Sequence, residues 1–306
     1  MSSVRSLTLV CLLILIAACD KIDQPVNVLI PSGLEDLDFS LFPGDPDSYP
    51  VPEFSPMDGG QKKILFEEYT GHKCTNCPPA AALAEEISED NPGRIVLVSV
   101  HASTSGDFQA TSSSHPTDFT TEAGDTYVNA FPLFIGNPHC TIDRVNNSAF
   151  GSVWHLTADW EERTADRLDA PLTVNLQMEL NYYPETNGLF VHTFSEAEAE
   201  LEGDFVLILY LLRDEVVSPQ SLLDGTVDDD YVHKHVLTDN INGTWGTPMG
   251  MDTLVVNEGE RHDFSYALPD PSMDSTFEGE NLTVVGFIVD RDTEEVHQAV
   301  YRHLVP

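Results

Sequence analysis

The chain has 306 residues, of which 41% are hydrophobic, and 51 Asp and Glu against 14 Lys and Arg give it a net charge of −37. A field of this sign repels the phosphates of nucleic acids and anionic lipid headgroups, so the composition argues against a partner of either class. The length and the hydrophobic fraction are those of a globular protein with two domains of ordinary size.

The N-terminus has the pattern of an export signal. Arg5 supplies a positive charge, residues 7–16 are almost all apolar, and two alanines lead into Cys19. Residues 16–19 resemble the lipobox of bacterial lipoproteins, which implies that residues 1–18 are a signal peptide and that the Cys19 thiol carries a diacylglycerol. The alternative is an ordinary secretory signal with an incidental cysteine. Since no later stretch reaches the roughly 20 apolar residues of a membrane-spanning helix, we expect a protein anchored to membrane lipid through acylated Cys19.

Residues 19–60 are predicted to be an acidic, Pro-rich tether. Prolines recur there among Asp, Glu, Gly and Ser without a sustained apolar period. A flexible segment of about 40 residues has an r.m.s. span of roughly 35 Å. We therefore expect the tether to hold the folded part clear of the lipid surface.

Residues 61–170 alternate between strand and helix patterns. Residues 63–69 are predicted as a strand, residues 77–90 as a helix with proline in its first turn, and residues 94–100 as a buried apolar strand. This order is a βαβ unit, which implies parallel pairing of its two strands. Three further elements are predicted to complete the domain: helices around 119–130 and 153–168 and a strand over 140–146.

Residues 171–306 have an all-β pattern. Short alternating or apolar runs are separated by turn residues, which indicates a β-sandwich of the immunoglobulin-like type. The predicted fold class is therefore α/β plus all-β, with a thioredoxin-like βαβ domain followed by the sandwich.

The pair Cys74 and Cys77 carries the chemistry that the sequence indicates. Export places these thiols in an oxidising compartment, where a disulfide can persist. A thiol in the first turn of a helix faces unpaired N–H groups, which lower its pKa, and Lys73 and His72 add positive charge. We expect Cys74 to be the exposed attacking thiolate and Cys77 to be the resolving partner.

Other uses of these cysteines stay open. One is a purely structural disulfide at the start of the helix. Another is a zinc or copper site that adds His72, His139 or Cys140, although no second CxxC completes four ligands. Cys140 is expected to be a small buried hydrophobe, and the alternative is a third thiol that exchanges with the pair.

The remaining polar clusters give weaker signals. His233 and His235 are predicted to share one face of a strand over 232–236, as surface or packing residues without a third metal ligand. The acidic run 228–230 is predicted as a solvated loop, with calcium binding as the alternative. No resident cofactor and no metal are predicted.

The strand, the CxxC and the helix together resemble thioredoxins. That resemblance implies a buried acid that assists proton transfer to the resolving cysteine, and Glu68 holds the matching position. Glu67 competes for this role, and Glu68 at a solvent-facing strand end is the alternative. The resemblance also implies a cis-proline before the strand that faces the CxxC. Pro132 and Pro138 are the candidates, and Pro138 is favoured because residues 140–144 continue as that strand.

Several segments resemble the outer membrane protein 28 (Omp28)-related lipoproteins of Bacteroidota, over about residues 62–306. The similar segments are residues 67–78, 118–125, 138–144, 218–220 and 231–237. The resemblance implies a thioredoxin-like domain followed by a β-sandwich on a lipoprotein of the outer membrane.

The leading functional hypothesis is a lipid-anchored thiol–disulfide oxidoreductase that acts on protein thiols or disulfides in or beyond the periplasm. Cys74 attacks, Cys77 resolves, Glu68 relays a proton, and Pro138 shapes the substrate groove. The alternative is a non-enzymatic binding or structural surface lipoprotein that uses the thioredoxin-like domain as a scaffold. Metal delivery is a third hypothesis.

Overall fold

The computed structural model describes residues 33–55, 57, 60–147, 151–250, 253–256 and 258–305. The predicted signal peptide and Cys19 lie outside the described residues. Across the described ranges, no helix is both long enough and apolar enough to cross a membrane.

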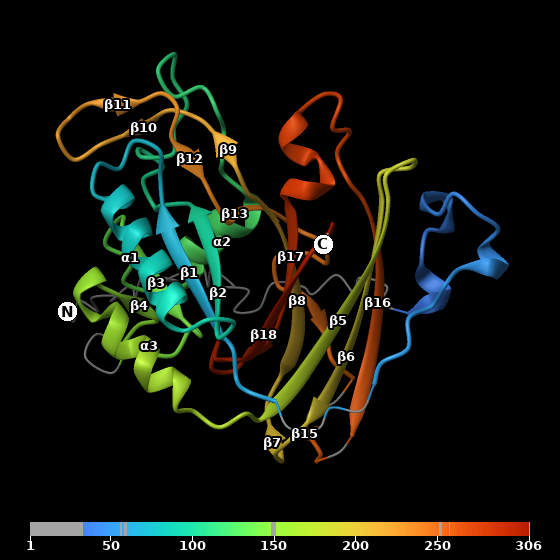
Figure 1. Cartoon of the computed structure of the whole chain (residues 1–306). Coiled ribbons are helices and arrows are strands. Elements are labelled where there is room, and N and C mark those ends of the chain that lie inside the picture. The colour runs from blue at the N-terminus through green and yellow to red at the C-terminus, as the bar shows by residue number, and fades with distance from the viewer. Residues whose placement is uncertain are drawn as a thin grey trace, which may run out of the picture.

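A nine-stranded mixed sheet forms the centre of the molecule (Figure 1). The strand order is β18-β17-β8-β13-β2-β1-β3-β4, and β14 also pairs with β8. β1 pairs in parallel with β2 and antiparallel with β3, and β13 joins the other edge of β2 in parallel. The strands are β1 (Ile64–Thr70), β2 (Ile95–His101), β3 (His139–Ile142), β4 (Trp154–His155), β8 (Phe205–Arg213), β13 (Val236–Asn240), β14 (Thr247–Pro248), β17 (Leu282–Asp290) and β18 (Val296–His303).

Helices cover the part of this sheet around β1. In β1, Ile64 and Phe66 belong to one cluster with apolar residues of α1 (Cys77–Asp90) and α3 (Trp160–Leu168). Leu65 and Tyr69 belong to the cluster on the opposite face, with α2 (Glu122–Ala130). This alternation is the period of two that a strand imposes on its side chains. The predicted βαβ unit is therefore present, with β1, α1 and β2 as its parts.

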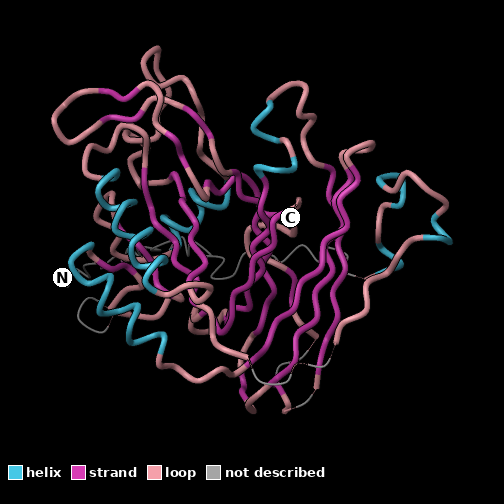
Figure 2. Tube along the Cα trace, viewed as in Figure 1, coloured by secondary structure: helices cyan, strands magenta, loops and turns pink. Residues whose placement is uncertain are grey.

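A three-stranded antiparallel sheet packs on the other part of the large sheet (Figure 2). Its strands are β5 (Val174–Tyr183), β6 (Gly188–Ala197) and β16 (Gly259–Ala267). Leu207, Leu209 and Leu211 of β8 face this sheet, whereas Ile208 and Tyr210 face the α2 side. β8 is thus buried on both faces, which explains its continuous apolar sequence.

Short elements connect these layers. The remaining strands are β7 (Leu201–Glu202), β9 (Val216–Val217), β10 (Gln220–Ser221), β11 (Val227–Asp228), β12 (Val232–His233) and β15 (Thr253–Leu254). The 3₁₀ helices are η1 (Leu34–Asp36), η2 (Phe39–Leu41), η3 (Pro46–Ser48), η4 (Thr157–Asp159), η5 (Ser275–Phe277) and η6 (Gly279–Asn281).

The mixed α/β character agrees with the prediction, but the large sheet crosses the predicted boundary between residues 170 and 171. Its strands β8, β13, β17 and β18 come from the part expected to form a separate sandwich. The physical reason is that β2 would otherwise leave an unpaired edge, which β13 closes. The three-stranded sheet therefore faces strands that are shared with the α/β part.

Residues 33–55 differ from the flexible tether expected for them. Phe39, Phe42 and Tyr49 pack around Phe190 of β6, with Tyr49 and Phe190 ring centroids 4.8 Å apart. The buried Tyr49 hydroxyl lies 2.7 Å from His192 Nε2. Aromatic side chains among the prolines supply the apolar area that fixes this segment on the three-stranded sheet.

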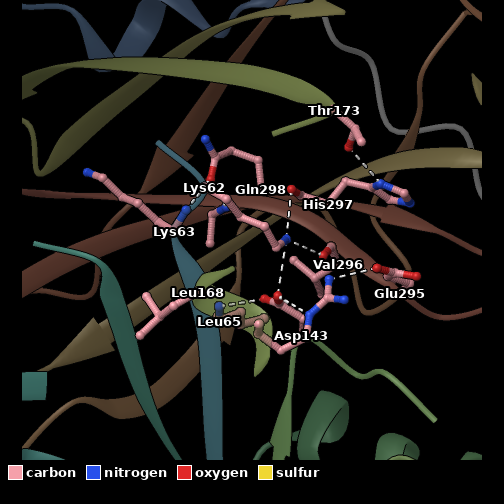
Figure 3. A network of polar contacts seen from close by, with 12 residues as sticks. Lys62, Lys63, Leu65, Asp143, Leu168, Thr173, Glu295, Val296, His297 and Gln298 are labelled. Carbon is pink, nitrogen blue, oxygen red and sulfur yellow. Dashed lines mark hydrogen bonds and ion pairs between the residues drawn. The ribbon is translucent and has the colours of Figure 1, made fainter. Parts of the chain in front are cut away.

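A buried ionic network joins the start of β1 to the start of β18 (Figure 3). Lys62 Nζ lies 3.1 Å from Asp143 Oδ2 and donates to Val296 O at 2.9 Å. Arg167 Nε lies 3.0 Å from the same Asp143 oxygen, and its Nη2 lies 2.6 Å from Glu295 Oε1. Lys62 and Asp143 are buried and Arg167 and Glu295 are partly exposed, and together their paired charges connect the two halves of the chain.

Candidate thiol–disulfide site

The CxxC lies where β1 passes into α1, as predicted. The loop after Thr70 turns so that Cys74 N donates to Gly71 O at 2.9 Å, and α1 begins at Cys77 with Pro78 and Pro79 in its first turn. Cys74 and Cys77 form a disulfide with a Cα–Cα distance of 5.4 Å. This places both sulfurs at the helix N-terminus, where unpaired backbone N–H groups favour a thiolate once the bond opens.

The expectation that Cys74 is exposed is wrong. Cys74 is only 2% exposed and Cys77 only 1%. The covering residues come from far along the chain: Gln220 Nε2 donates to Cys74 O at 3.1 Å, and Ser221 N donates to His72 O at 2.9 Å. No local pattern around the CxxC signals this cover, because it is made by the β10–β11 hairpin some 146 residues away.

The two neighbouring glutamates of β1 have opposite environments. Glu67 faces the α2 side, where Arg144 Nη2 lies 2.7 Å from Glu67 Oε1 and Tyr210 Oη donates to the same oxygen at 2.9 Å. Burial alone would raise the pKa of Glu67, but Arg144 and these hydrogen bonds lower it below its ordinary value. Glu67 is therefore an ionised structural residue and not the relay.

Glu68 faces the opposite side, toward α1. It is 4% exposed, and its Oε1 has no hydrogen-bond partner in the described part of the chain. Burial, with a smaller contribution from the charge of Glu85, raises the pKa of Glu68 to about 8. At neutral pH the Glu68 side chain is thus a carboxylic acid, which is able to donate a proton.

A cavity of about 320 Å³ joins Glu68 to the disulfide. Its walls include Glu68 of β1, Cys77 and Ala81 of α1, and His101 at the end of β2. His233 of β12 also lines it, while Cys74 does not. Cys77 thus forms part of the cavity wall, although it is only 1% exposed.

Several charged side chains interact with one another at the wall of this cavity. Nε2 of His235 is 3.3 Å from Glu85 Oε1, and Nδ1 of His235 is 3.2 Å from Asp214 Oδ1. Although burial disfavours a charged imidazole, the bonds to Asp214 and Glu85 raise the pKa of His235 to about 9. His235 is therefore an imidazolium at neutral pH.

The peptide bond before Pro138 is cis, at the position that the sequence analysis favours over Pro132. β3 begins at His139, directly after it. Asn137 Nδ2 donates to Ala102 O at 3.0 Å, and Gln109 Nε2 donates to Asn137 Oδ1 at 3.2 Å. These amide contacts join the loop that carries Pro138 to Gln109 and to Ala102, the residue after β2.

The chain matches the model of a known protein family. The model of the family described as "Outer membrane protein Omp28" matches residues 125–304. The chain belongs to the Omp28 family. This family membership places the protein at the outer membrane, the localisation that the sequence predicts.

Three solved structures are similar to this Omp28 family member. HBP35 of Porphyromonas gingivalis is 13% identical, with a TM-score of 0.57, over 81% of this chain and 76% of that chain. A protein of Agrobacterium tumefaciens is 13% identical, with a TM-score of 0.45, over 80% and 95%. A domain of the outer membrane lipoprotein Omp28 from Porphyromonas gingivalis is 24% identical, with a TM-score of 0.30, over 44% and 89%. No curated protein matches the chain significantly.

Other predicted site residues of the Omp28 chain lie apart from the cavity. Cys140 is fully buried in the apolar cluster under α1 and α3 and is not part of a disulfide. In the register of β3 against β1, it lies opposite Glu68. His139 packs against Phe134. In the described ranges, no group of three or more His, Cys, Asp or Glu side chains is arranged to hold a metal ion.

The prediction that His233 and His235 share one face of a single strand is wrong. β12 ends at His233 and β13 begins at Val236, and His235 between them has a φ of +52°. The chain therefore turns there: His233 packs against Phe119, whereas His235 binds Glu85. The sequence analysis missed Glu85, His101 and Gln220 as parts of the site. Nothing in the local sequence distinguishes Glu85 and His101 from surface or packing residues, and the family resemblance of residues 218–220 gives Gln220 no role.

Proposed function

We propose that this Omp28 family member, anchored to lipid through Cys19, cycles its Cys74–Cys77 pair between disulfide and dithiol in a thioredoxin-like arrangement. Glu68 moves the proton of the reaction, and Pro138 shapes the surface near the pair. Strands that follow residue 171 support and cover this site. An envelope protein in an oxidising compartment is a setting in which such a pair can work.

One observation carries this proposal: the buried carboxyl group of Glu68 lines the same cavity as Cys77, and its Oε1 has no hydrogen-bond partner among the described residues. A buried polar atom without a hydrogen bond costs about 1–3 kcal/mol, so a fold retains one only for a reason. A purely structural disulfide needs no proton and gives no such reason. A disulfide that opens and closes releases a thiolate, and a neutral carboxyl group in reach assists this step by protonating it.

The proposed step is balanced in atoms and electrons. An incoming thiolate attacks one sulfur of the pair and forms a mixed disulfide, while the bond between Cys74 and Cys77 breaks. The departing sulfur keeps the electron pair as a thiolate, and the Glu68 carboxyl protonates it. A second thiol then displaces the first, so that the pair is reduced and the two external thiols are oxidised to their disulfide.

The burial of Cys74 favours a second candidate function, that of a non-enzymatic lipoprotein with the α/β part as its scaffold. In that case the disulfide only fastens the start of α1. The two functions differ in what happens when Glu68 loses its acidity, since a scaffold has no use for its proton.

The test measures how fast dithiothreitol reduces the native protein between pH 6 and pH 9, with Glu68→Gln as the variant. Each rate is divided by the concentration of dithiothreitol thiolate, so that the ionisation of the reagent does not contribute to the pH dependence. Because general acid catalysis is worth roughly a hundredfold or more, we expect Glu68→Gln to be at least about tenfold slower below pH 8. The wild-type rate should fall above pH 8, as Glu68 ionises.

Glu86→Gln is the matched control, because Glu86 is an exposed residue of α1 outside the cavity. It should reduce at the wild-type rate. If Glu68→Gln also behaves like the wild type at every pH, the proton relay is absent and the scaffold function is the better account.

A further inference from the structure

Four buried histidines gather around Phe119, near the CxxC loop. This histidine cluster consists of His72, His101, His115 and His233, each at most 5% exposed. The rings of His101 and His233 pack on Phe119, with centroids 4.5 Å and 4.7 Å from its ring. The ring centroids of His72 and His115 are 5.1 Å apart, and those of His101 and His233 are 5.6 Å apart. Imidazoles at this spacing repel one another when both are protonated.

The histidine cluster lies where the CxxC loop meets the segment that covers it. This cover segment, residues 216–233, contains β9, the β10–β11 hairpin and β12. Ser221 N donates to His72 O at 2.9 Å, and Ser221 Oγ lies 3.1 Å from His115 Nε2. His233 belongs to β12, at the end of the cover segment. A change in the charge of the cluster therefore acts on the contact between the cover segment and the CxxC loop.

Burial keeps the imidazoles of the cluster uncharged at neutral pH. It lowers the pKa of His72 below its ordinary value and the pKa of His101 well below it. It also lowers the pKa of His233 to about 4. Burial is the largest cause for all three residues, and other histidines of the cluster lower the pKa of each further.

Two acids and two cations act on the histidine cluster. Both acids are exposed, so water and salt screen their attraction for a charged imidazole, whereas one cation is buried and the other half-buried. The acids are Asp118 and Asp229, and the cations are Arg213 and Lys73. These fixed charges therefore give little compensation for a proton on the cluster.

The other titratable groups near the cluster supply no counter-charge in acid. Glu68 lines the same cavity as His101 and His233, but burial raises its pKa to about 8, so it is neutral in acid. The ring centroid of Tyr231 lies 4.8 Å from that of His233, and burial raises the pKa of Tyr231 to about 12. The remaining charged residues of the cavity wall interact with one another, and they are Glu85, Lys234 and His235.

We propose that the histidine cluster is an acid-sensitive switch: its protonation releases the cover segment and opens the Cys74–Cys77 disulfide to solvent. In the closed state, a proton on the cluster is a buried charge beside other imidazoles. In the open state, water solvates the same charge. Access to the disulfide is a property separate from the proton transfer proposed for Glu68.

The direction and size of the effect follow from His233 alone. With a pKa of about 4 in the closed state and the ordinary value of 6.5 in the open state, His233 binds fewer protons when the cover is closed. The closed state therefore loses stability as pH falls below 6.5. Between pH 7.5 and pH 5 the open state gains about 30-fold in population relative to the closed state.

The main experiment measures reduction of the oxidised native protein by tris(2-carboxyethyl)phosphine at pH 5 and pH 7.5. Each rate is divided by the rate for oxidised glutathione at the same pH, so that protonation of the phosphine does not contribute. We expect this ratio to be at least about tenfold higher at pH 5 than at pH 7.5. Equal ratios at the two pH values would overturn the proposal.

Two variants show whether the cluster causes this acid response. His233→Gln does not titrate, and its amide is able to donate to Ser218 O, which lies 3.1 Å from His233 Nε2. We expect the increase at pH 5 to be at least about fivefold smaller in this variant. His303→Gln, at an exposed position of β18, is the matched control and should respond like the wild type. A wild-type response in His233→Gln would overturn the role of the cluster.

Hydrogen–deuterium exchange of the wild type gives a second test, which holds even if His233→Gln is open at every pH. After correction for the intrinsic pH dependence of exchange, residues 218–232 should lose at least about tenfold in protection between pH 7.5 and pH 5. Residues 206–211 of β8 should stay protected over the same labelling times. Unchanged protection of residues 218–232, or equal loss in both segments, would contradict a local opening of the cover segment.

The Glu68→Gln variant separates the acid-sensitive switch from the proposed function. If it is reduced as fast as the wild type and both respond to acid, the proton relay is overturned while the switch stands. If it is slower than the wild type and neither responds to acid, the switch is overturned while the relay stands.

Discussion

The adjacent residues Glu67 and Glu68 lie on opposite faces of β1, so their carboxyl groups have different environments. Alternation along β1 turns Glu67 toward Arg144 and Glu68 toward α1. The sequence favours Glu68 over Glu67 for the proposed relay by its position before Cys74, but it does not show which face of β1 is covered by α1. Other residues of the cavity wall, such as His235, could not be predicted from the sequence, because only contacts in the folded chain bring them to the cavity.

The raised pKa of Glu68 predicts a pH-dependent cost in stability. Between the ordinary pKa near 4.5 and the folded-state pKa of about 8, the unfolded chain loses this proton while the folded chain keeps it. The contribution of Glu68 to stability therefore falls as pH rises through this window. We expect Glu68→Gln to be more stable than the wild type by about 3 kcal/mol at pH 7 and nearly equal to it at pH 4. Urea unfolding at both pH values measures this difference, and equal stability at pH 7 would contradict it.

Arg144 is a fully buried cation whose loss should be costly. It bonds to Glu67 and Tyr210 and lies 4.4 Å from the ring centroid of Tyr127. Arg144→Leu leaves Glu67 buried and uncompensated, so we expect a loss of about 3–5 kcal/mol in the free energy of unfolding. Arg163→Leu, which removes an exposed ion pair of α3, should cost less than about 1 kcal/mol. Similar losses for the two variants would contradict the role given to Arg144.

At the scale of elements, the hairpin formed by β10 and β11 contacts the CxxC loop, and we expect it to limit access to the disulfide. Its contact with the CxxC loop depends on the hydrogen bonds from Gln220 and Ser221. Removing one buried hydrogen bond costs about 1 kcal/mol, so Gln220→Ala should raise the open population, and the rate of reduction by a phosphine, about fivefold. Gln177→Ala, which removes an exposed hydrogen bond of β5 to Ser55, is the control and should have no effect. A rate in Gln220→Ala equal to that of the wild type would show that the hairpin is not the barrier.

The helices and strands could largely be predicted from the sequence, whereas the pairing and packing between distant elements could not. The βαβ unit and the strands after residue 171 follow from local apolar periods, which a sequence displays directly. The pairing of β13 with β2, and the packing of residues 33–55 on β6, join segments far apart in the chain. Such pairings depend on which buried edge or apolar face remains uncovered, and no local period encodes that.

At the scale of the whole molecule, one sheet contains strands from both halves of the chain. The cluster around α2 contains residues of β2 together with residues of β8 and β17. Lys62 and Asp143 connect to β18, and Glu67 connects to Tyr210 of β8. The two predicted domains therefore share a core, and we expect them to unfold together.

A fragment of residues 61–170 tests this expectation. Without β13 it exposes an edge of β2, and without β8 it exposes one side of the α2 cluster, so we expect no cooperative thermal transition in the fragment. The chain without residues 1–18 should unfold in one transition. A fragment that melts cooperatively near the temperature of the full chain would show that residues 61–170 form an independent domain.

The reduction potential of the Cys74–Cys77 pair in the intact protein tests the central claim most directly. It is measured by equilibrating the folded protein in dithiothreitol and glutathione redox buffers and by trapping the free thiols. Because the pair is proposed to exchange, its potential should lie above about −300 mV, within reach of small thiols. A potential below that value, or a disulfide that opens only when the protein unfolds, would contradict the account.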